Sequence, residues 1–338
     1  MSFFSFESLN PRRLRVQLGR LLLLSIAAAT LHAQTCLTAS DMDDAARTAL
    51  LNTAQNYFQM MAGGDSAALK QNSTPSLAAD FSGIETAVQD NQANFSGLKA
   101  VPRSPFLLQE EGSAPQDRAE FLCGVFGPNG QTSDSAVFQI PNLPLGSYGI
   151  VIADASTAKG PYVVTFVLEK QDSAWKLGGL YVKQLQAAGH DGNWFAQRAR
   201  EFKTKGKNES AWLYYQEARE LLVPVSFMSS MITDKLYDEA QTVKPADLPP
   251  ADLNANSKTF RLTALFPLAV GNELDLVVKY QSASVANSSL TYQDNMTVMK
   301  GMLAKYPELR DAFDGIIARA VEASGRDYGS MLPMKAVK

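Results

Sequence analysis

The first long pattern of apolar residues after the N-terminal region lies in residues 43–62, where they recur every three to four positions. This spacing places them on one side of an amphipathic helix. The adjacent glycines Gly63 and Gly64 then end the pattern, as glycine commonly ends helices. Further helices are expected over residues 66–70 and 82–94. The apolar side of the first helix comprises Ala46, Leu50, Ala54, Tyr57, Phe58 and Met61.

From about Phe106 apolar and polar residues alternate, which is the period of a half-buried β-strand. Clusters of Gly, Pro, Asn and Asp separate the alternating segments and indicate turns. Helices followed by antiparallel strands predict an α+β fold for residues 34–190, with the helices packed on a curved antiparallel sheet. The expected strands are Phe106–Glu110, Ala119–Phe126, Ser135–Ile140, Tyr148–Ala155, Tyr162–Lys170 and Trp175–Gln184.

Two short motifs in this region carry a resemblance to a known family. The first motif closes the first helix with Tyr57, a following methionine and Gly64-Asp65. In the second motif a charged turn precedes the Trp175-x-Leu177 strand. The chain from about residue 43 to 185 resembles the nuclear transport factor 2-like superfamily. That resemblance implies a curved sheet wrapped around a cone-shaped cavity. Tyr57 and Met61 are then possible ligand contacts, although aromatic and Met residues at helical spacing also suit a core.

Residues 191–240 return to helical spacing and are expected to form a helical hairpin followed by a third helix over 226–240. Small and aromatic residues in 193–223 resemble one tetratricopeptide-like hairpin, except that Val223 stands where that family has proline. A simple helical hairpin remains the alternative. A lone repeat cannot bury both its faces, so it must pack on the sheet domain or on a partner. Trp194, Trp212 and Tyr215 are the candidate partner contacts.

The remaining chain divides into a linker and a small module. Residues 241–258 are rich in proline and polar residues, which indicates a linker. Residues 259–338 are expected to form a ββαββ module. Its strands are predicted over 259–267, 273–282, 315–323 and 328–334, and its helix over 295–305.

Residues 1–33 read as a cleavable signal peptide. Four arginines precede the apolar run Leu21–Leu31, and cleavage is expected after Ala33. A membrane anchor is the alternative, but the apolar run of 11 residues is shorter than the about 20 that cross a bilayer. Export places Cys36 and Cys123 in an oxidising compartment, so a disulfide between them is favoured over two buried thiols.

Charge and motif content exclude several classes of function. Without residues 1–33 the chain has 27 basic and 33 acidic side chains, which argues against a nucleic-acid-binding face. No zinc, calcium or phosphate-binding motif is present, so no metal or cofactor is expected. His190, beside Asp191, could act as a general base, but the flanking glycines suit a solvated loop equally well.

These features lead to one leading hypothesis and two alternatives. The leading hypothesis is an exported, non-enzymatic envelope protein, periplasmic or secreted, that binds a partner protein or a small apolar ligand. The first alternative is an enzyme that uses a carboxylate or tyrosine in the cone-shaped cavity. The second alternative is a structural spacer in an envelope assembly.

Overall fold

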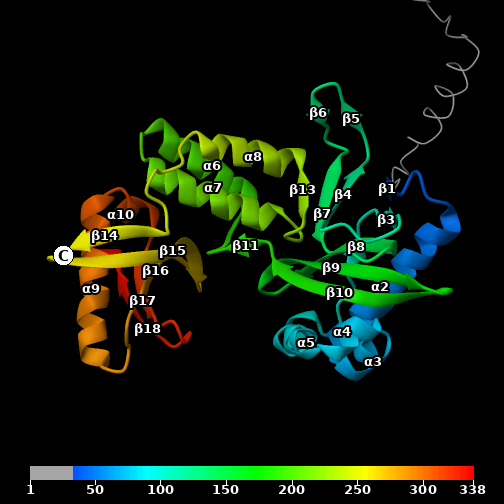
Figure 1. Ribbon diagram of the computed structural model, residues 1–338, viewed down its shortest axis with the longest axis horizontal. Helices are drawn as coiled ribbons and strands as arrows, with labels where there is room; N and C mark the ends of the chain where they lie inside the picture. The colour runs from blue at the N-terminus through cyan, green and yellow to red at the C-terminus, as the bar shows by residue number, and fades with distance from the viewer. Residues whose placement is uncertain (1–32) are drawn as a thin grey trace, which may run out of the picture.

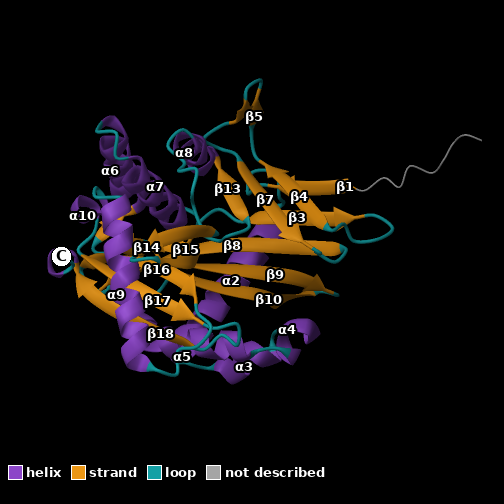
Figure 2. Cartoon of the chain, turned by 60° about the vertical axis from the view of Figure 1, so that its left-hand side comes forward, coloured by secondary structure: helices purple, strands orange, loops and turns teal. Residues whose placement is uncertain are grey.

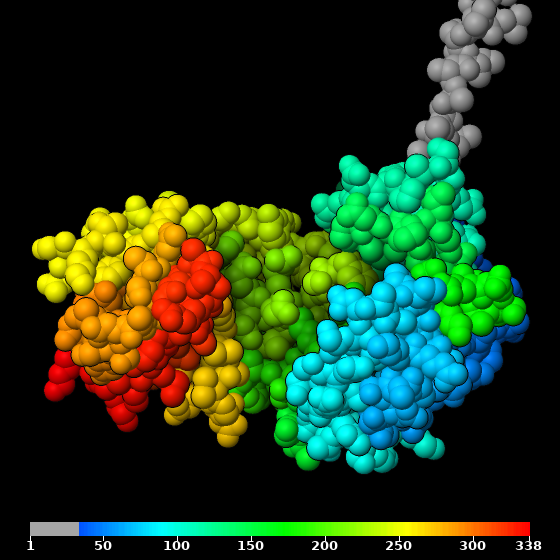
Figure 3. Space-filling model, turned by 60° about the horizontal axis from the view of Figure 1, so that its bottom comes forward, coloured from blue at the N-terminus to red at the C-terminus, as the bar shows by residue number. Residues whose placement is uncertain are grey.

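The computed structural model describes residues 33–338 and has an α+β fold (Figure 1). We call residues 33–185 the N-lobe and residues 186–338 the C-lobe. The space-filling view shows the N-lobe at one end of the molecule and the C-terminal residues, in orange and red, at the other (Figure 3). The helices that begin the C-lobe lie between them in Figure 1. The expected signal peptide lies outside the described residues, except for Ala33, at which the first strand begins.

Helices cover one face of the main sheet in the N-lobe. Asp43 caps the first helix by accepting a hydrogen bond from the Ala46 amide, and Gly64 ends it in the left-handed conformation. Leu50, Phe58 and other residues of its apolar side are buried against the sheet. The helices are α2 (Asp44–Gly63), α3 (Ser66–Gln71), α4 (Pro75–Ala79) and α5 (Ser82–Phe95). The sheet has the order β1 (Ala33–Leu37), β3 (Phe106–Glu111), β8 (Gly146–Thr157), β9 (Gly160–Gln171) and β10 (Ala174–Gln184), with β2 (Val101–Pro102) beside β8.

A second, three-stranded sheet covers the other face of the main sheet. The expected strands over 119–126 and 135–140 belong to this second sheet, where the side chains of Phe121 and Phe138 meet those of Leu108 and Ile150 from the main sheet. The N-lobe therefore has three layers, one helical and two of strands. The second sheet comprises β4 (Arg118–Cys123), β7 (Ala136–Pro141) and β13 (Met228–Ser230), and the small hairpin β5 (Phe126–Gly127) and β6 (Gly130–Gln131) joins β4 to β7.

The predicted disulfide is confirmed. Cys36 in β1 is bonded to Cys123 in β4, so the bond joins the two sheets of the N-lobe at their edges. The Gln34 side chain adds a second link, since its Oε1 accepts a hydrogen bond of 3.0 Å from the Glu120 amide. Strand β1 was not predicted from the sequence.

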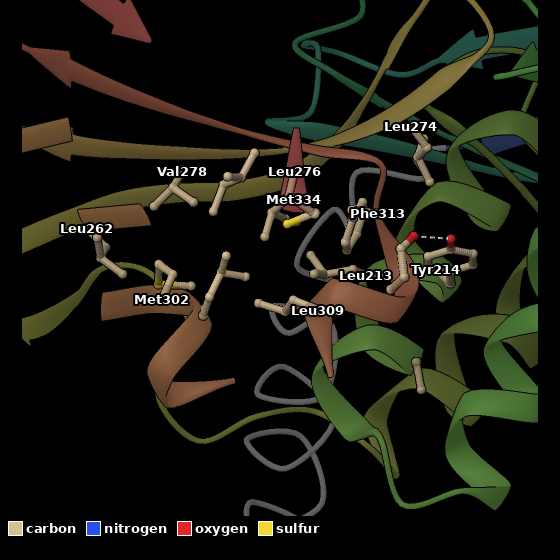
Figure 4. Packing of buried hydrophobic residues seen from close by; sticks show 14 of the residues in the cluster. Leu213, Tyr214, Leu262, Leu274, Leu276, Val278, Met302, Leu309, Phe313 and Met334 are labelled. Carbon is tan, nitrogen blue, oxygen red and sulfur yellow. Dashed lines mark hydrogen bonds between the residues drawn. The ribbon is translucent and has the colours of Figure 1, made fainter. Parts of the chain in front are cut away.

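One continuous hydrophobic core fills the C-lobe. It joins the helical hairpin to the C-terminal module, and Figure 4 shows Leu213 and Tyr214 of the hairpin beside Leu309 and Phe313 of the module. The lone hairpin thus buries one face on the C-terminal module. The C-lobe helices are α6 (Gly192–Thr204), α7 (Asn208–Leu222), α8 (Met231–Gln241), α9 (Ser288–Lys305) and α10 (Leu309–Ala312), and the short strands β11 (Gln186–Ala187) and β12 (His190–Asp191) precede α6.

The C-terminal sheet has five strands rather than the expected four. The extra strand, β14, lies inside the segment 241–258 that was expected to be a linker. Asp252 and Asn254 are exposed on either side of the buried Leu253, a pattern that the neighbouring prolines obscure in the sequence. Strands β16 and β17 are parallel and α9 connects them across one face (Figure 2). In order, the strands are β14 (Ala251–Ala255), β15 (Lys258–Val270), β16 (Glu273–Gln281), β17 (Gly315–Val321) and β18 (Asp327–Pro333), followed by η1 (Met334–Ala336).

Strand β13 connects the two lobes. It follows α7 in the sequence yet pairs with β7 of the N-lobe, through Met228 opposite Phe138 and Ser230 opposite Ala136. The expected helix over 226–240 therefore begins only at Met231. In residues 33–338, no helix combines the length and the apolar character needed to cross a bilayer.

Candidate functional site

The candidate site is a cavity of about 410 Å³ where the helical hairpin meets the C-terminal module. We call it the junction pocket. Its volume falls in the range of about 300 to 1,000 Å³ that is usual for ligand pockets. Four separate stretches of chain form its walls, and most of the side chains are polar or charged. The lining residues are Ala188, His190, Trp194, Phe195, Gln197, Arg198, Glu201, Tyr214, Asn272, Leu274, Arg310, Asp311, Ala312, Phe313 and Asp314.

An aromatic pair forms the rim of the junction pocket. The His190 imidazole stacks on the Trp194 indole, with ring centroids 3.7 Å apart and planes 7° from parallel. The helix start explains this geometry, because the Asp191 carboxylate caps α6 by accepting a hydrogen bond of 2.8 Å from the Trp194 amide. Trp194 remains 36% exposed. An exposed indole held in one position by its neighbours is suited to contact a ligand.

The cationic side chains of the pocket are held by partners within the protein. Arg198 forms an ion pair of 2.5 Å with Glu201, one turn further along α6. Arg310 donates hydrogen bonds of 2.9 and 2.8 Å to the carbonyl oxygens of Met334 and Val337. Both guanidinium groups are therefore fixed in place, so a ligand that meets them orders few side chains on binding.

The acidic side chains of the pocket also form contacts within the protein. The Asp314 carboxylate accepts a hydrogen bond of 2.9 Å from the Leu274 amide, which fixes the start of β16 against α10. Asp311 forms an ion pair with Lys207 at the turn between α6 and α7. Because their acceptor groups are engaged, these residues shape the wall of the pocket. Among the described residues no group of three or more His, Cys, Asp or Glu is placed to hold a metal ion.

Among residues 33–338, no carboxylate is hydrogen-bonded to the His190 imidazole as a general base would need. Asp191 is its neighbour in the sequence, but the Asp191 carboxylate is directed to the backbone of α6. In the usual arrangement a carboxylate orients the imidazole that takes up the proton. The stacked His190 is therefore better suited to binding than to proton transfer.

The two candidate contacts in the N-lobe, Tyr57 and Met61, lie in its core. They are 4% and 0% exposed and pack between α2 and the main sheet. The Tyr57 hydroxyl donates to the carbonyl oxygens of Asn72 and Trp175, at 3.1 and 3.0 Å. Burial raises the pKa of this phenol. Both residues stabilise the packing of helices on the sheet and are not placed to meet a ligand.

The three candidate contacts in the helical hairpin do not converge on one surface. Trp194 lines the junction pocket, whereas Tyr215 is fully buried within the helical core. Trp212 is half-buried and faces a narrow apolar crevice beside Pro249, under the Lys244 ammonium. The three residues therefore do not share one exposed surface, because α7 turns Tyr215 towards the C-lobe core.

Several residues of the junction pocket were not identified from the sequence. Arg198 is on a helix that was predicted, but nothing in the local pattern distinguishes it from a solvated arginine. Arg310 lies within the short α10 and Asp314 follows it, more than 100 positions further along the chain. Only the packing of α7 on α10 brings these stretches together.

The chain was also compared with known proteins. No protein-family model, no curated protein and no solved structure matches it.

Proposed function

We propose that this is an exported, non-enzymatic envelope protein that binds a partner protein at the junction pocket. One observation carries the proposal: Trp194 is partly exposed at the rim of the pocket and is stacked on His190. Tryptophan, tyrosine and arginine dominate the binding energy of protein interfaces. The rim of the junction pocket offers Trp194 and Arg198, with Tyr214 beneath them.

The polarity of the pocket favours a protein partner over a small apolar ligand. Charged side chains from α6 and α10 occur around most of its wall. Burying an apolar ligand there would remove water from these groups without replacing their hydrogen bonds, which costs free energy. A polar side chain or loop of a partner could replace those hydrogen bonds.

The disulfide supports export. Structural disulfides form and persist in oxidising compartments and are rare in the cytosol. Cys36 lies three residues after the proposed cleavage site, and its bond to Cys123 anchors the first strand of the mature chain. We therefore propose the periplasm or the extracellular medium as its location. The likeness of the N-lobe to the nuclear transport factor 2-like superfamily, and of α6 and α7 to a tetratricopeptide unit, remains part of the proposal.

Site-specific photo-crosslinking tests this function. A photoreactive amino acid at Gln197, an exposed position on the pocket wall, should crosslink one discrete envelope protein when the purified mature protein is mixed with an envelope extract of its source. Trp194→Ala should reduce that crosslink at least about tenfold, since truncating a central aromatic typically costs about 2 kcal/mol or more.

Tyr292→Ala is the matched control, because Tyr292 is a similarly exposed aromatic on α9. It should leave the crosslink unchanged. A crosslinked product that persists at full strength in Trp194→Ala would contradict the proposed binding site.

A further inference from the structure

Strand β14 is an edge strand whose outer side is unpaired. It bonds to β15 along one side, from Ala251 opposite Leu262 to Ala255 opposite Lys258. The hairpin turns at Asn256-Ser257, where both residues have positive φ, as in the two-residue turns that favour tight hairpins. An unpaired edge is a template for another extended chain.

The turn determines which backbone groups of β14 point outwards. In a two-residue hairpin the residues that flank the turn, here Ala255 and Lys258, bond to each other. Hydrogen-bonded pairs then alternate along the strand, so the N–H and C=O groups of Asp252 and Asn254 point away from β15. Within residues 33–338 these groups make no backbone hydrogen bond.

A groove runs along this unpaired edge. It has a volume of about 920 Å³ and lies between β14 and the side of α9. Gly301 allows the helix to approach the strand closely, because a Cβ there would lie 2.8 Å from the Ala255 Cβ and 3.3 Å from a Leu253 methyl. The half-buried side chains of Met296 and Thr297 continue the floor of the groove.

The lysines beside the groove differ in whether they form ion pairs with described residues. Lys258 is paired with Asp294 at 2.6 Å, and Lys305 is paired with Asp247. The exposed ammonium of Lys300, on the helix side of the groove, makes no ion pair with any described residue. An acidic side chain of a bound peptide would complement it.

We propose that the groove between β14 and α9 binds an extended acidic peptide segment of a partner protein, which adds to the C-terminal sheet as a sixth strand. Main-chain hydrogen bonds to Asp252 and Asn254 would supply affinity that does not depend on sequence. Alternate side chains of the peptide would reach the apolar floor, and an acidic residue would meet Lys300. This site is separate from the junction pocket and does not depend on the function proposed for it.

The probe is a random heptapeptide library displayed on phage and selected on the purified mature protein. The enriched peptides are expected to be rich in Asp and Glu. Synthesised with a fluorescein label, they should bind in fluorescence anisotropy and slow the hydrogen exchange of the Asp252 and Asn254 amides. A selection that enriches no peptide would overturn the proposal.

Asn254→Pro tests the backbone contact. Proline removes the outward N–H, and proline is tolerated on edge strands whose N–H faces solvent. Peptide affinity should fall about tenfold or more through loss of that hydrogen bond. Asn254→Ala is the matched control, because it keeps the N–H. It should bind the peptides with the affinity of the parent protein. Equal binding to the proline variant, with its circular dichroism unchanged, would overturn the proposal.

Lys300→Glu tests the charge contact. It should lower the affinity for the acidic peptides and raise the affinity for their counterparts with Lys in place of Glu. Lys159→Glu makes the same charge change on the N-lobe and should alter neither affinity. Trp194→Ala should leave peptide binding intact, which separates this site from the junction pocket. If sedimentation instead shows a dimer that Asn254→Pro dissociates, a second copy of the chain occupies the groove and the peptide proposal is overturned.

Discussion

The Tyr214 hydroxyl of α7 donates a hydrogen bond to the carbonyl oxygen of Ala312 at the end of α10, across 98 positions of sequence. The Tyr214 ring also packs against Phe195, Phe202 and Phe313. The hydrogen bond and the contact with Phe313 join the helical hairpin to the C-terminal module. They also form the floor of the junction pocket, so the stability of this junction and the shape of the pocket depend on the same side chain.

Removing this hydroxyl should destabilise the protein. Tyr214→Phe leaves the buried carbonyl of Ala312 without its donor while keeping the ring in place. Leaving a buried polar group unsatisfied costs about 1 to 3 kcal/mol. The free energy of unfolding, measured in urea on the mature protein, should fall by that amount.

Tyr292→Phe provides the comparison, since Tyr292 is 44% exposed on α9. Its free energy of unfolding should match that of the parent. Equal stability of the Tyr214→Phe variant and the parent would show that the hydroxyl does not stabilise the junction.

Elements with strong local patterns could be predicted from the sequence, and elements that depend on distant partners could not. The helix over 43–62 and the long strand around Phe166 have many apolar residues at the correct period. β13 has only three residues, and it pairs with β7, about 90 positions earlier in the chain. No local pattern reveals such a pairing. The division of strands between two sheets was missed because alternation shows that a strand is half-buried but not which sheet it joins.

Residues of the candidate site show the same difference between local patterns and distant contacts. Trp194 could be selected because it is a large aromatic at the start of a predicted helix. Tyr215 was selected as an aromatic residue of the same predicted hairpin, but it is buried among the C-lobe helices, where Arg200 of α6 and Glu239 of α8 lie near its hydroxyl. Arg310 and Asp314 could not be connected to Trp194, since only the tertiary contact between α7 and α10 brings them together.

Loss of the disulfide should cost about 4 to 5 kcal/mol. The bond between Cys36 and Cys123 spans 87 positions, and cross-linking a loop of this length removes much entropy from the unfolded chain. The double variant Cys36→Ala with Cys123→Ala should unfold at a correspondingly lower urea concentration. Hydrogen exchange should accelerate most at the β1 amides, because the bond holds this edge strand to β4.

A reducing agent provides the control for this prediction. Dithiothreitol should destabilise the parent protein and leave the double variant unaffected. A parent protein whose unfolding does not respond to full reduction would show that other contacts, such as that of Gln34 with Glu120, are enough to hold β1.

A close contact between a helix and the sheet should make Gly149 intolerant of substitution. A Cβ at Gly149 in β8 would lie 2.1 Å from a Leu50 methyl on α2. Gly149→Ala should therefore destabilise the N-lobe by about 1 to 3 kcal/mol through overpacking. Thermal unfolding followed by circular dichroism measures the loss.

A double-mutant cycle identifies the clash as the cause. Leu50→Ala removes the methyl groups and itself costs about 2 to 5 kcal/mol. In that background Gly149→Ala should cost much less than in the parent. Gly329→Ala, on β18, is the control, because its Cβ would find its nearest neighbour at 3.8 Å. Additive effects of Leu50→Ala and Gly149→Ala would argue against the contact.

Glu217 on α7 should make stability depend on pH near neutrality. Burial, with a contribution from nearby Glu220, raises the pKa of the Glu217 carboxyl to about 7, from an ordinary value of 4.5, and Lys183 offsets part of this effect. The folded protein therefore binds this proton more tightly than the unfolded chain does. The free energy of unfolding should consequently decrease as pH rises from about 4.5 to about 7, and it should level off above that range.

Glu217→Gln removes this titration while keeping a side chain of similar size. The variant should be more stable than the parent at pH 8, where Glu217 is ionised, and the two should converge near pH 5. Urea unfolding across this pH range measures the difference. Glu220→Gln makes the same change at an exposed carboxylate that is paired with Lys183 at 2.7 Å, so it should not stabilise the protein at pH 8. If the slopes of the parent and Glu217→Gln are identical between pH 5 and 8, Glu217 titrates as an ordinary surface glutamate.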